Sequence, residues 1–132
     1  MSQEPQGTPG PVLVSACLLG LRTRYDGTDC RRPRLLERLC GSCIVPVCPE
    51  QLGGLPTPRE PAEINRGDGR WVLRDEARVV RRDGADVTEN YRRGAEQVLR
   101  IGRVNGARRA ILKEGSPACG TTRLKRAGAD VE

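Results

Sequence analysis

Histidine and phenylalanine are both absent from the 132 residues of the sequence. Histidine is the side chain that most often serves as a general base, and it is a common zinc ligand. Its absence excludes Ser-His-Asp and Cys-His catalysis and every metal site that needs an imidazole. Catalysis would have to depend on cysteine, serine, lysine or carboxylate side chains, or on a metal centre held by thiolates.

Aromatic side chains are scarce, with one tryptophan and two tyrosines in the chain. Proteins that bind single-stranded nucleic acids stack the bases on such side chains. The net charge of +6 suggests nucleic-acid binding, but Lys113 and Lys125 are the only lysines among 23 basic residues, and acidic residues are interspersed throughout. We interpret the arginines as a compositional bias, and we do not expect general nucleic-acid binding.

Long apolar runs are missing as well. No segment approaches the roughly 18 apolar residues of a membrane span, and the start "MSQEPQGTPGP" does not have the pattern of a signal peptide. We therefore expect a cytoplasmic protein without a membrane partner. In that reducing compartment the six cysteines are more naturally metal ligands, catalytic groups or core residues than disulfides.

The chain length predicts one domain over residues 11–132, after a disordered polar tail at 1–10. Apolar runs that are too short for helices predict strands at 12–16, 44–47 and 110–113, and a small hairpin made of 71–73 and 77–80. Between these strands, the glycine- and proline-rich segment 53–69 predicts a long ordered loop.

Helices are expected between the strands. They are predicted over 35–39, from a cap at Asp86 or Thr88 to a stop at Gly106, and in the closing segment up to Gly128. Strands that alternate with helices are typical of an α/β fold. We predict a Rossmann-like layered fold with a mainly parallel sheet flanked by helices.

Three cysteines follow apolar runs. They are Cys17, Cys48 and Cys119, and the carboxyl ends of parallel strands form the edge where such folds bind ligands. Three thiolates that hold a four-iron cluster leave one iron open to a substrate. The alternative is that these cysteines are small buried residues at strand ends, since free cysteine is often buried.

A second set of cysteines is compact in sequence. Cys40 and Cys43 form the "CGSC" motif, and Cys48 follows shortly after. This spacing is typical of a zinc knuckle or a redox dithiol, with Cys17 or Cys30 as a fourth ligand. Because no second C-x-x-C pair is present, a structural zinc-binding or adaptor protein stays an open alternative.

Several separated motifs resemble one known family. The segments "VSACLLG", "TRYDG", "VPVCPEQLGGLPTPREPAEI", "GDGR" and "AILKEGSPACG" resemble the thiouracil desulfidases, catalogued as domain of unknown function 523. The resemblance runs from Val12 to Gly120. It implies a [4Fe-4S] cluster held by Cys17, Cys48 and Cys119, with one iron that has no protein ligand. Cys30, Cys40 and Cys43 match no ligand of the family.

The resemblance also implies an activity and two catalytic residues, which fall on Glu50 and Ser116. The expected reaction is the non-redox removal of sulfur from a thiolated pyrimidine, a thiouracil base or nucleotide, to give uracil and sulfide. Without the resemblance, Glu50 is a charge at a helix start and Ser116 a turn hydroxyl. An iron-sulfur protein that transfers sulfur is a further alternative.

Two more features bear on the expected pocket. Arg24, Tyr25 and Asp26 follow the first cysteine, and the glycine- and proline-rich loop follows the second, so both segments are candidates for its walls. After Gly120 the chain lacks a glycine-rich segment that the family pattern contains at this point. The expected domain is therefore shortened at one wall of the pocket.

Overall fold

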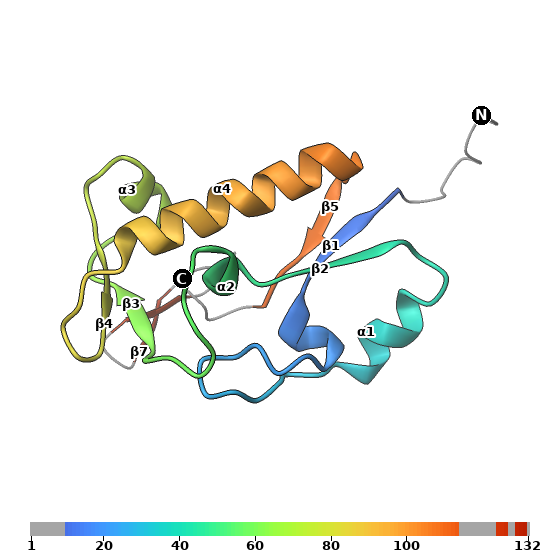
Figure 1. The fold of residues 1–132 in the computed structure, drawn as a ribbon, viewed down its shortest axis with the longest axis horizontal. Coiled ribbons are helices and arrows are strands. Elements are labelled where there is room, and N and C mark those ends of the chain that lie inside the picture. Colours follow the sequence, from blue (N-terminus) through green and yellow to red (C-terminus); the bar gives the residue numbers. More distant parts are fainter. Residues whose placement is uncertain (1–9, 114–123, 127–128, 132) are drawn as a thin grey trace.

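The computed structural model describes residues 10–113, 124–126 and 129–131, and Figure 1 shows their arrangement. The helices are, in chain order, the 3-10 helix η1 (Ala16–Leu19), α1 (Pro33–Arg38), α2 (Pro49–Leu52), α3 (Gly69–Leu73) and α4 (Thr88–Asn105). The strands are β1 (Val12–Ser15), β2 (Ile44–Val47), β3 (Ala62–Ile64), β4 (Val79–Arg81), β5 (Arg109–Ile111), β6 (Leu124–Arg126) and β7 (Ala129–Val131).

The central sheet is parallel, with β1 between β2 and β5. Ser15 lies opposite Val47, and Val14 lies opposite Ile111. All four residues of β1 are buried, as is usual for a parallel strand with both faces covered. The carboxyl ends of the three strands therefore share one edge, and the prediction of an α/β fold with a parallel sheet is confirmed.

The predicted strands lie close to their expected places. β2 has the predicted bounds, whereas β1 stops at Ser15 because η1 begins at Ala16. The third strand is 109–111 rather than 110–113. Element ends are the least certain part of a sequence-based assignment, so these shifts do not change the topology.

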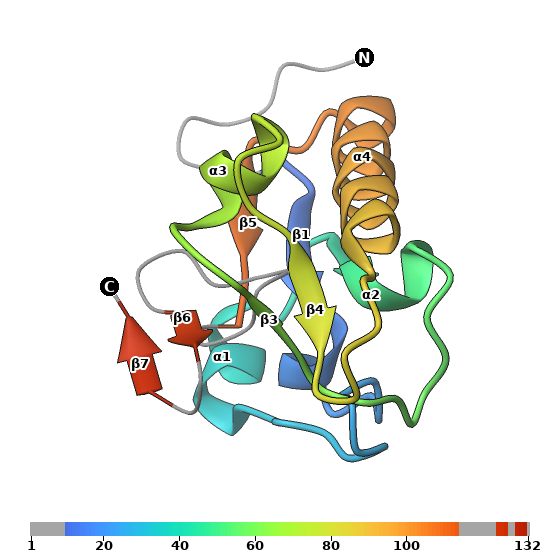
Figure 2. The ribbon, with the colours of Figure 1, turned by 90° about the vertical axis from the view of Figure 1, so that its left-hand side faces the viewer.

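Helix α4 confirms the predicted long helix. The Asp86 carboxylate accepts hydrogen bonds from the backbone N–H of Thr88 (2.9 Å) and from its hydroxyl (2.6 Å). Gly106 ends the helix in the left-handed conformation, with φ of 67°, which glycine adopts without strain. Figure 2 shows that α4 runs alongside the central sheet with α2 next to it.

The predicted hairpin of 71–73 and 77–80 is wrong. Residues 71–73 belong to α3, which the Asp68 side chain caps by accepting from the N–H of Arg70. Strand β4 pairs antiparallel with β3 instead, so the expected loop 53–69 contains a strand. Three residues are too few for an alternating pattern to identify a strand, and the aspartate cap favours a helix at Gly69.

The predicted closing helix is also wrong, because β6 and β7 pair antiparallel in that segment. A helix of so few residues gains little from its own hydrogen bonds. Paired strands satisfy the same backbone groups across the segment. The predicted polar tail lies, apart from Gly10, outside the described residues.

Two clusters of buried side chains form the core. One surrounds β3, β4, α3 and the start of α4, and contains Ile64, Val79 and Tyr91. The other lies around β1, η1 and α1, and includes Cys17 with Cys30 packed against it. The first thiol of interest is thus part of the packed core beside the central sheet.

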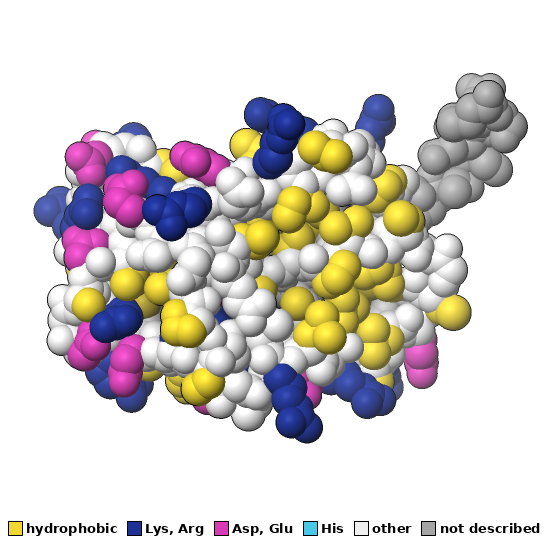
Figure 3. Space-filling view, viewed as in Figure 1, with side chains coloured by type: hydrophobic (Ala, Val, Ile, Leu, Met, Phe, Trp, Pro, Cys, Tyr) yellow, Lys and Arg dark blue, Asp and Glu magenta, His cyan; other side chains and the backbone are white. Residues whose placement is uncertain are grey.

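Charges of both signs intermingle over the α3 and β4 end of the face shown in Figure 3, while apolar side chains gather over its other half. Ion pairs join many of these charges, for instance Arg78 with Asp86 at 2.8 Å and Arg81 with Asp83 at 2.7 Å. These arginines face neighbouring carboxylates and do not form a surface of one sign. In the part of the chain that the structure describes, no helix is long and apolar enough to cross a membrane.

Candidate functional site

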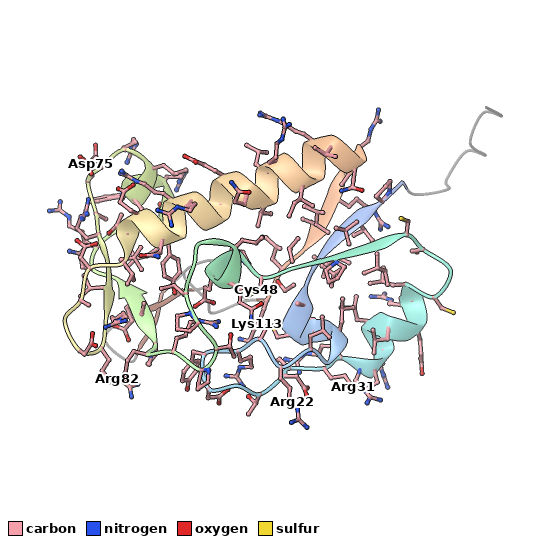
Figure 4. All side chains as sticks on the ribbon, viewed as in Figure 1. Arg22, Arg31, Cys48, Asp75, Arg82 and Lys113 are labelled. Carbon is pink, nitrogen blue, oxygen red and sulfur yellow. The ribbon has the colours of Figure 1, made fainter. Side chains whose placement is uncertain are left out.

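Two of the three predicted thiols lie at the carboxyl edge of the central sheet. Cys48 directly follows β2, and Cys17 lies in η1, two residues after β1. Lys113 follows β5 at the same edge, and Figure 4 labels both Lys113 and Cys48. This is the edge at which an open parallel sheet binds its ligands.

The Cys17 thiol is buried, with 8% of the residue exposed. Its pKa is raised, chiefly because burial disfavours the thiolate, and further by Cys30 and Cys48, whereas the cations Lys113 and Arg24 oppose the rise. The fold alone therefore favours the neutral thiol at Cys17. A bound metal would have to displace this proton, as metals do when thiols ligate them.

The segment that follows Cys17 is hydrogen-bonded to both Cys17 and Cys48. The N–H of Cys30 donates to the carbonyl of Cys17 at 2.8 Å. The Cys48 thiol donates to the carbonyl of Thr23, with an Sγ to oxygen distance of 3.8 Å. The loop that contains Arg24 and Tyr25 is consequently next to the edge, where the sequence placed one wall of a pocket.

The compact cysteine set does not assemble. Cys43 precedes β2 and Cys48 follows it, so the extended strand separates their Cα atoms by roughly 16 Å. Cys40 and Cys43 are exposed. Among the described residues, which include all five cysteines of the zinc hypothesis, no three metal-binding side chains come together. The described structure therefore does not bring together the ligands of the alternative zinc site, because Cys43 and Cys48 lie at opposite ends of one strand.

Glu50 lies in the first turn of α2, two residues after Cys48. Its Oε2 atom accepts hydrogen bonds from Nε of Arg59 (3.0 Å) and from the hydroxyl of Tyr91 (2.8 Å). The Glu50 side chain is only 16% exposed. A partly buried carboxylate with two fixed donors has a defined orientation, which suits a group that moves a proton.

Arg59 is the most connected side chain near the site, and only 3% of it is exposed. Besides Glu50, its guanidinium donates to the carbonyls of Thr23 (2.8 Å) and Pro56 (3.2 Å) and to the Thr57 hydroxyl (2.8 Å). Burial lowers the pKa of Arg59, but the hydrogen bond and charge of Glu50 outweigh burial and raise it. Arg59 therefore stays charged in the interior.

Sequence reasoning missed both partners of Glu50. Arg59 lies in the "PTPREP" stretch, which was assigned only to a loop. Tyr91 was assigned only to the apolar face of the long helix. The sequence offers one signal for Arg59. An arginine between two prolines in an ordered loop contacts little water if the loop packs against the fold, so it needs hydrogen-bond partners in the protein.

Helix α4 holds α2 in place by direct backbone contact. A Cβ atom on Gly94 would overlap the carbonyl oxygen of Pro49, and one on Gly53 would overlap that of Asn90. The Asn90 side chain donates to the carbonyl of Gly53 at 2.8 Å. Since Tyr91 follows Asn90, this contact also sets the position of Glu50 relative to its tyrosine partner.

The remaining predicted site residues, Ser116 and Cys119, lie outside the described residues. They follow Lys113, whose N–H is hydrogen-bonded to Ser15 at the carboxyl edge. The structure thus places Cys17, Cys48 and the start of α2, which contains Glu50, at the carboxyl edge of the sheet. For Ser116 and Cys119 it describes only β5, the strand that precedes them in the chain.

Comparison with known proteins gives three matches. The sequence pattern of the 2-thiouracil desulfurase family matches residues 12–130. An uncharacterised protein of Bacillus subtilis (strain 168), YbbK, is 44% identical over 110 residues, which are 83% of this chain and 73% of that protein. A solved structure described as the [4Fe-4S]-dependent thiouracil desulfidase TudS (DUF523) is similar with a TM-score of 0.77 and 41% identity, over 92% of this chain and 78% of that one.

Proposed function

The chain belongs to the 2-thiouracil desulfurase family, and we propose that it removes sulfur from a thiolated pyrimidine, a thiouracil base or nucleotide. The products are uracil, or its nucleotide, and sulfide. The observation that carries this proposal is that Cys17 and Cys48 both follow strands at the carboxyl edge of the central sheet, in a chain that the family pattern matches over residues 12–130.

The proposed cofactor is a [4Fe-4S] cluster with Cys17, Cys48 and Cys119 as its ligands. The buried thiol of Cys17 and the partly buried thiol of Cys48 at the sheet edge fit such a group, since iron-sulfur clusters prefer thiolate ligands. When bound, the cluster supplies an iron without a protein ligand, a Lewis acid for the sulfur of the substrate. The similar solved structure is described as [4Fe-4S]-dependent, which supports this assignment.

Glu50 and Ser116 are the proposed proton carriers. Replacing C=S by C=O consumes one water, whose oxygen stays on the ring and whose two protons leave with the sulfur or return to solvent. No electrons are exchanged, so no reductant is needed. Glu50 suits this role because its carboxylate is oriented by two donors and shielded from bulk water.

The cytoplasm is the proposed compartment. Its reducing environment keeps thiols free, and none of the five described cysteines is in a disulfide. We further propose that residues 11–132 form a single domain, since one family pattern matches residues 12–130.

The test is an assay of anaerobically purified protein. Iron and acid-labile sulfide are measured first, and 2-thiouracil, 4-thiouracil and their nucleotides are then supplied without a reductant. Release of sulfide with formation of the uracil product is expected. Protein that carries the cluster and releases no sulfide would contradict the proposal, and release that requires an electron donor would contradict the non-redox chemistry. Transfer of the sulfur to a second molecule would favour a sulfur-transfer protein.

A further inference from the structure

The two oxygens of the Glu50 carboxylate are not equivalent. Oε2 accepts two hydrogen bonds, one from Arg59 and one from Tyr91. Within the ranges that the structure describes, no donor reaches Oε1. A carboxylate oxygen with two donors has little remaining capacity to accept a proton from water, whereas the other oxygen keeps its lone pairs available.

Arg59 holds this arrangement through further hydrogen bonds. Its Nη2 atom donates to the carbonyl of Thr23, which also accepts the thiol of Cys48. Its backbone N–H donates to the carbonyl of Tyr25 at 2.7 Å. Arg59 therefore connects three parts of the site. They are the segment that follows Cys17, the helix α2 that follows Cys48, and the loop to which Arg59 itself belongs.

Tyr91 is the second donor to the same carboxylate oxygen, Oε2. It is 7% exposed and belongs to the core cluster around β3, β4 and α3. Its place in α4 is tied to α2 through the Gly53 and Gly94 contacts. The phenol that donates to Oε2 is thus part of a buried and closely packed region of the fold.

We propose that Arg59 and Tyr91 are positioning residues for the desulfidation, which hold the Glu50 carboxylate by Oε2 and so fix its orientation, with Oε1 as the oxygen available to a reacting group. This inference rests on the proposed function. Neither side chain needs to touch the substrate, because each acts through Glu50. An error of about 1 Å in the position of a reacting group costs up to about 100-fold in rate, so the clamp has a measurable effect.

The first test is a double-mutant cycle between Glu50→Gln and Tyr91→Phe, because the tyrosine change removes only the hydroxyl. In the wild-type background, Tyr91→Phe should lower kcat by about 10-fold and leave KM unchanged. In the Glu50→Gln background, whose own loss is about 100-fold or more, Tyr91→Phe should cause no further fall. Arg59→Lys, which keeps the charge but loses the fork of donors, should show the same coupling.

Arg92→Lys is the matched control. Arg92 is also partly buried, and it also donates to a backbone carbonyl, that of Val72 at 2.7 Å, but it does not reach Glu50. Its conversion to lysine should leave kcat and KM unchanged. Iron, acid-labile sulfide and the thermal midpoint are measured for every variant, and all should stay near the wild-type values for Tyr91→Phe.

A second readout does not depend on turnover. In holoprotein labelled with isotope-enriched arginine, the Nε–H resonance of Arg59 should be protected from solvent exchange, and Glu50→Gln should shift it while Arg92→Lys should not. Equal falls in kcat in both backgrounds, for Tyr91→Phe and for Arg59→Lys, would overturn the proposal, as would an unshifted resonance. If wild-type holoprotein released no sulfide, the proposed function would fail, whereas the resonance would still report whether the clamp exists.

Discussion

The side-chain hydroxyl of Ser15 accepts a hydrogen bond from the backbone N–H of Lys113 at 2.9 Å. Ser15 is the last residue of β1 and is 2% exposed. Lys113 lies two residues beyond β5, the neighbouring strand. This hydrogen bond therefore connects β1 and the segment after β5 beyond the last paired residues of the two strands, at the edge where the thiols lie.

Replacing Ser15 by alanine should therefore destabilise the protein. The Lys113 N–H would lose this acceptor inside the fold, so the free energy of unfolding should fall by about 1–2 kcal/mol. Urea unfolding of both proteins measures the difference. Ser42→Ala, at the other end of β2, is the control, and an equal loss in the two variants would contradict a specific role for this bond.

The proposed cluster ligands can be separated from the exposed thiols. Cys17→Ser, Cys48→Ser and Cys119→Ser should each lose most of the iron and acid-labile sulfide, because serine is a poor ligand for iron-sulfur clusters. The Cys40→Ser, Cys43→Ser double variant should keep the metal and the activity, since both cysteines lie beyond the opposite end of β2. Metal loss from the double variant with retention in Cys119→Ser would contradict the proposed ligand set.

Catalysis can be separated from assembly at Glu50 and Ser116. Glu50→Gln and Ser116→Ala should keep the cluster content near wild type while kcat falls by about 100-fold or more, the scale of a positioned acid-base group. Iron analysis and sulfide release measure the two effects. If a variant kept normal turnover, its residue would have no part in the mechanism. If a variant lost its iron, the role of that residue would be structural.

The close contact of α2 and α4 predicts an unusual response to alanine. Gly94→Ala should lower the free energy of unfolding by about 1–3 kcal/mol, the cost of overpacking, because the new Cβ meets the Pro49 carbonyl. Gly102→Ala in the same helix is the control, since its Cβ meets only a terminal carbon of Leu13 at 3.3 Å. If both variants were equally stable, the contact would be looser than the structure shows.

The start of α4 should make stability depend on acid. Hydrogen bonds from Arg78 and then from Thr88 lower the pKa of Asp86 from 3.8 to about 2. A lowered pKa in the folded state adds stability above the unfolded value, and this contribution is lost as the pH falls from about 4 to about 2. At pH 7, Asp86→Asn removes the charge that pairs with Arg78, so it should lower the free energy of unfolding by up to about 1 kcal/mol.

Urea titrations at several pH values test this expectation. The gap between wild type and Asp86→Asn should narrow between pH 4 and pH 2, in the direction given by the lowered pKa. Asp83→Asn, in the exposed turn before Ala85, gives a comparison with a second carboxylate whose pKa is also lowered. A gap that stayed constant with pH would show that the carboxylate charge of Asp86 does not stabilise the fold.

The central sheet and the thiol edge were readable from the sequence because their signals are local. Val12 to Val14 and Ile44 to Val47 are apolar runs of strand length, and each is followed by a cysteine within a few residues. The parallel arrangement then places Cys17 and Cys48 at one edge. Helix α4 was readable for a similar reason, since a cap and a glycine stop enclose it.

The clamp around Glu50 was not readable, because its contacts join distant segments. Arg59 meets Glu50 nine residues away and Thr23 thirty-six residues away, and Tyr91 meets Glu50 across forty-one residues. No spacing rule connects these positions. The hairpin error has a related cause: β3 is stabilised by its pairing with β4, not by a pattern of its own.

The glycine contact between α2 and α4 has a consequence for experiments that map tolerance to mutation. Every amino acid other than glycine carries a Cβ atom, so Gly53 and Gly94 should reject nearly all single substitutions in a saturation screen for activity. Such a map would give these two positions the same weight as the thiols, although neither contributes chemistry. Scoring protein abundance in the same screen would separate the glycines from residues with a chemical role, since the glycine variants should lose folded protein whereas Glu50→Gln, which keeps an oxygen acceptor for Arg59, should lose mainly turnover.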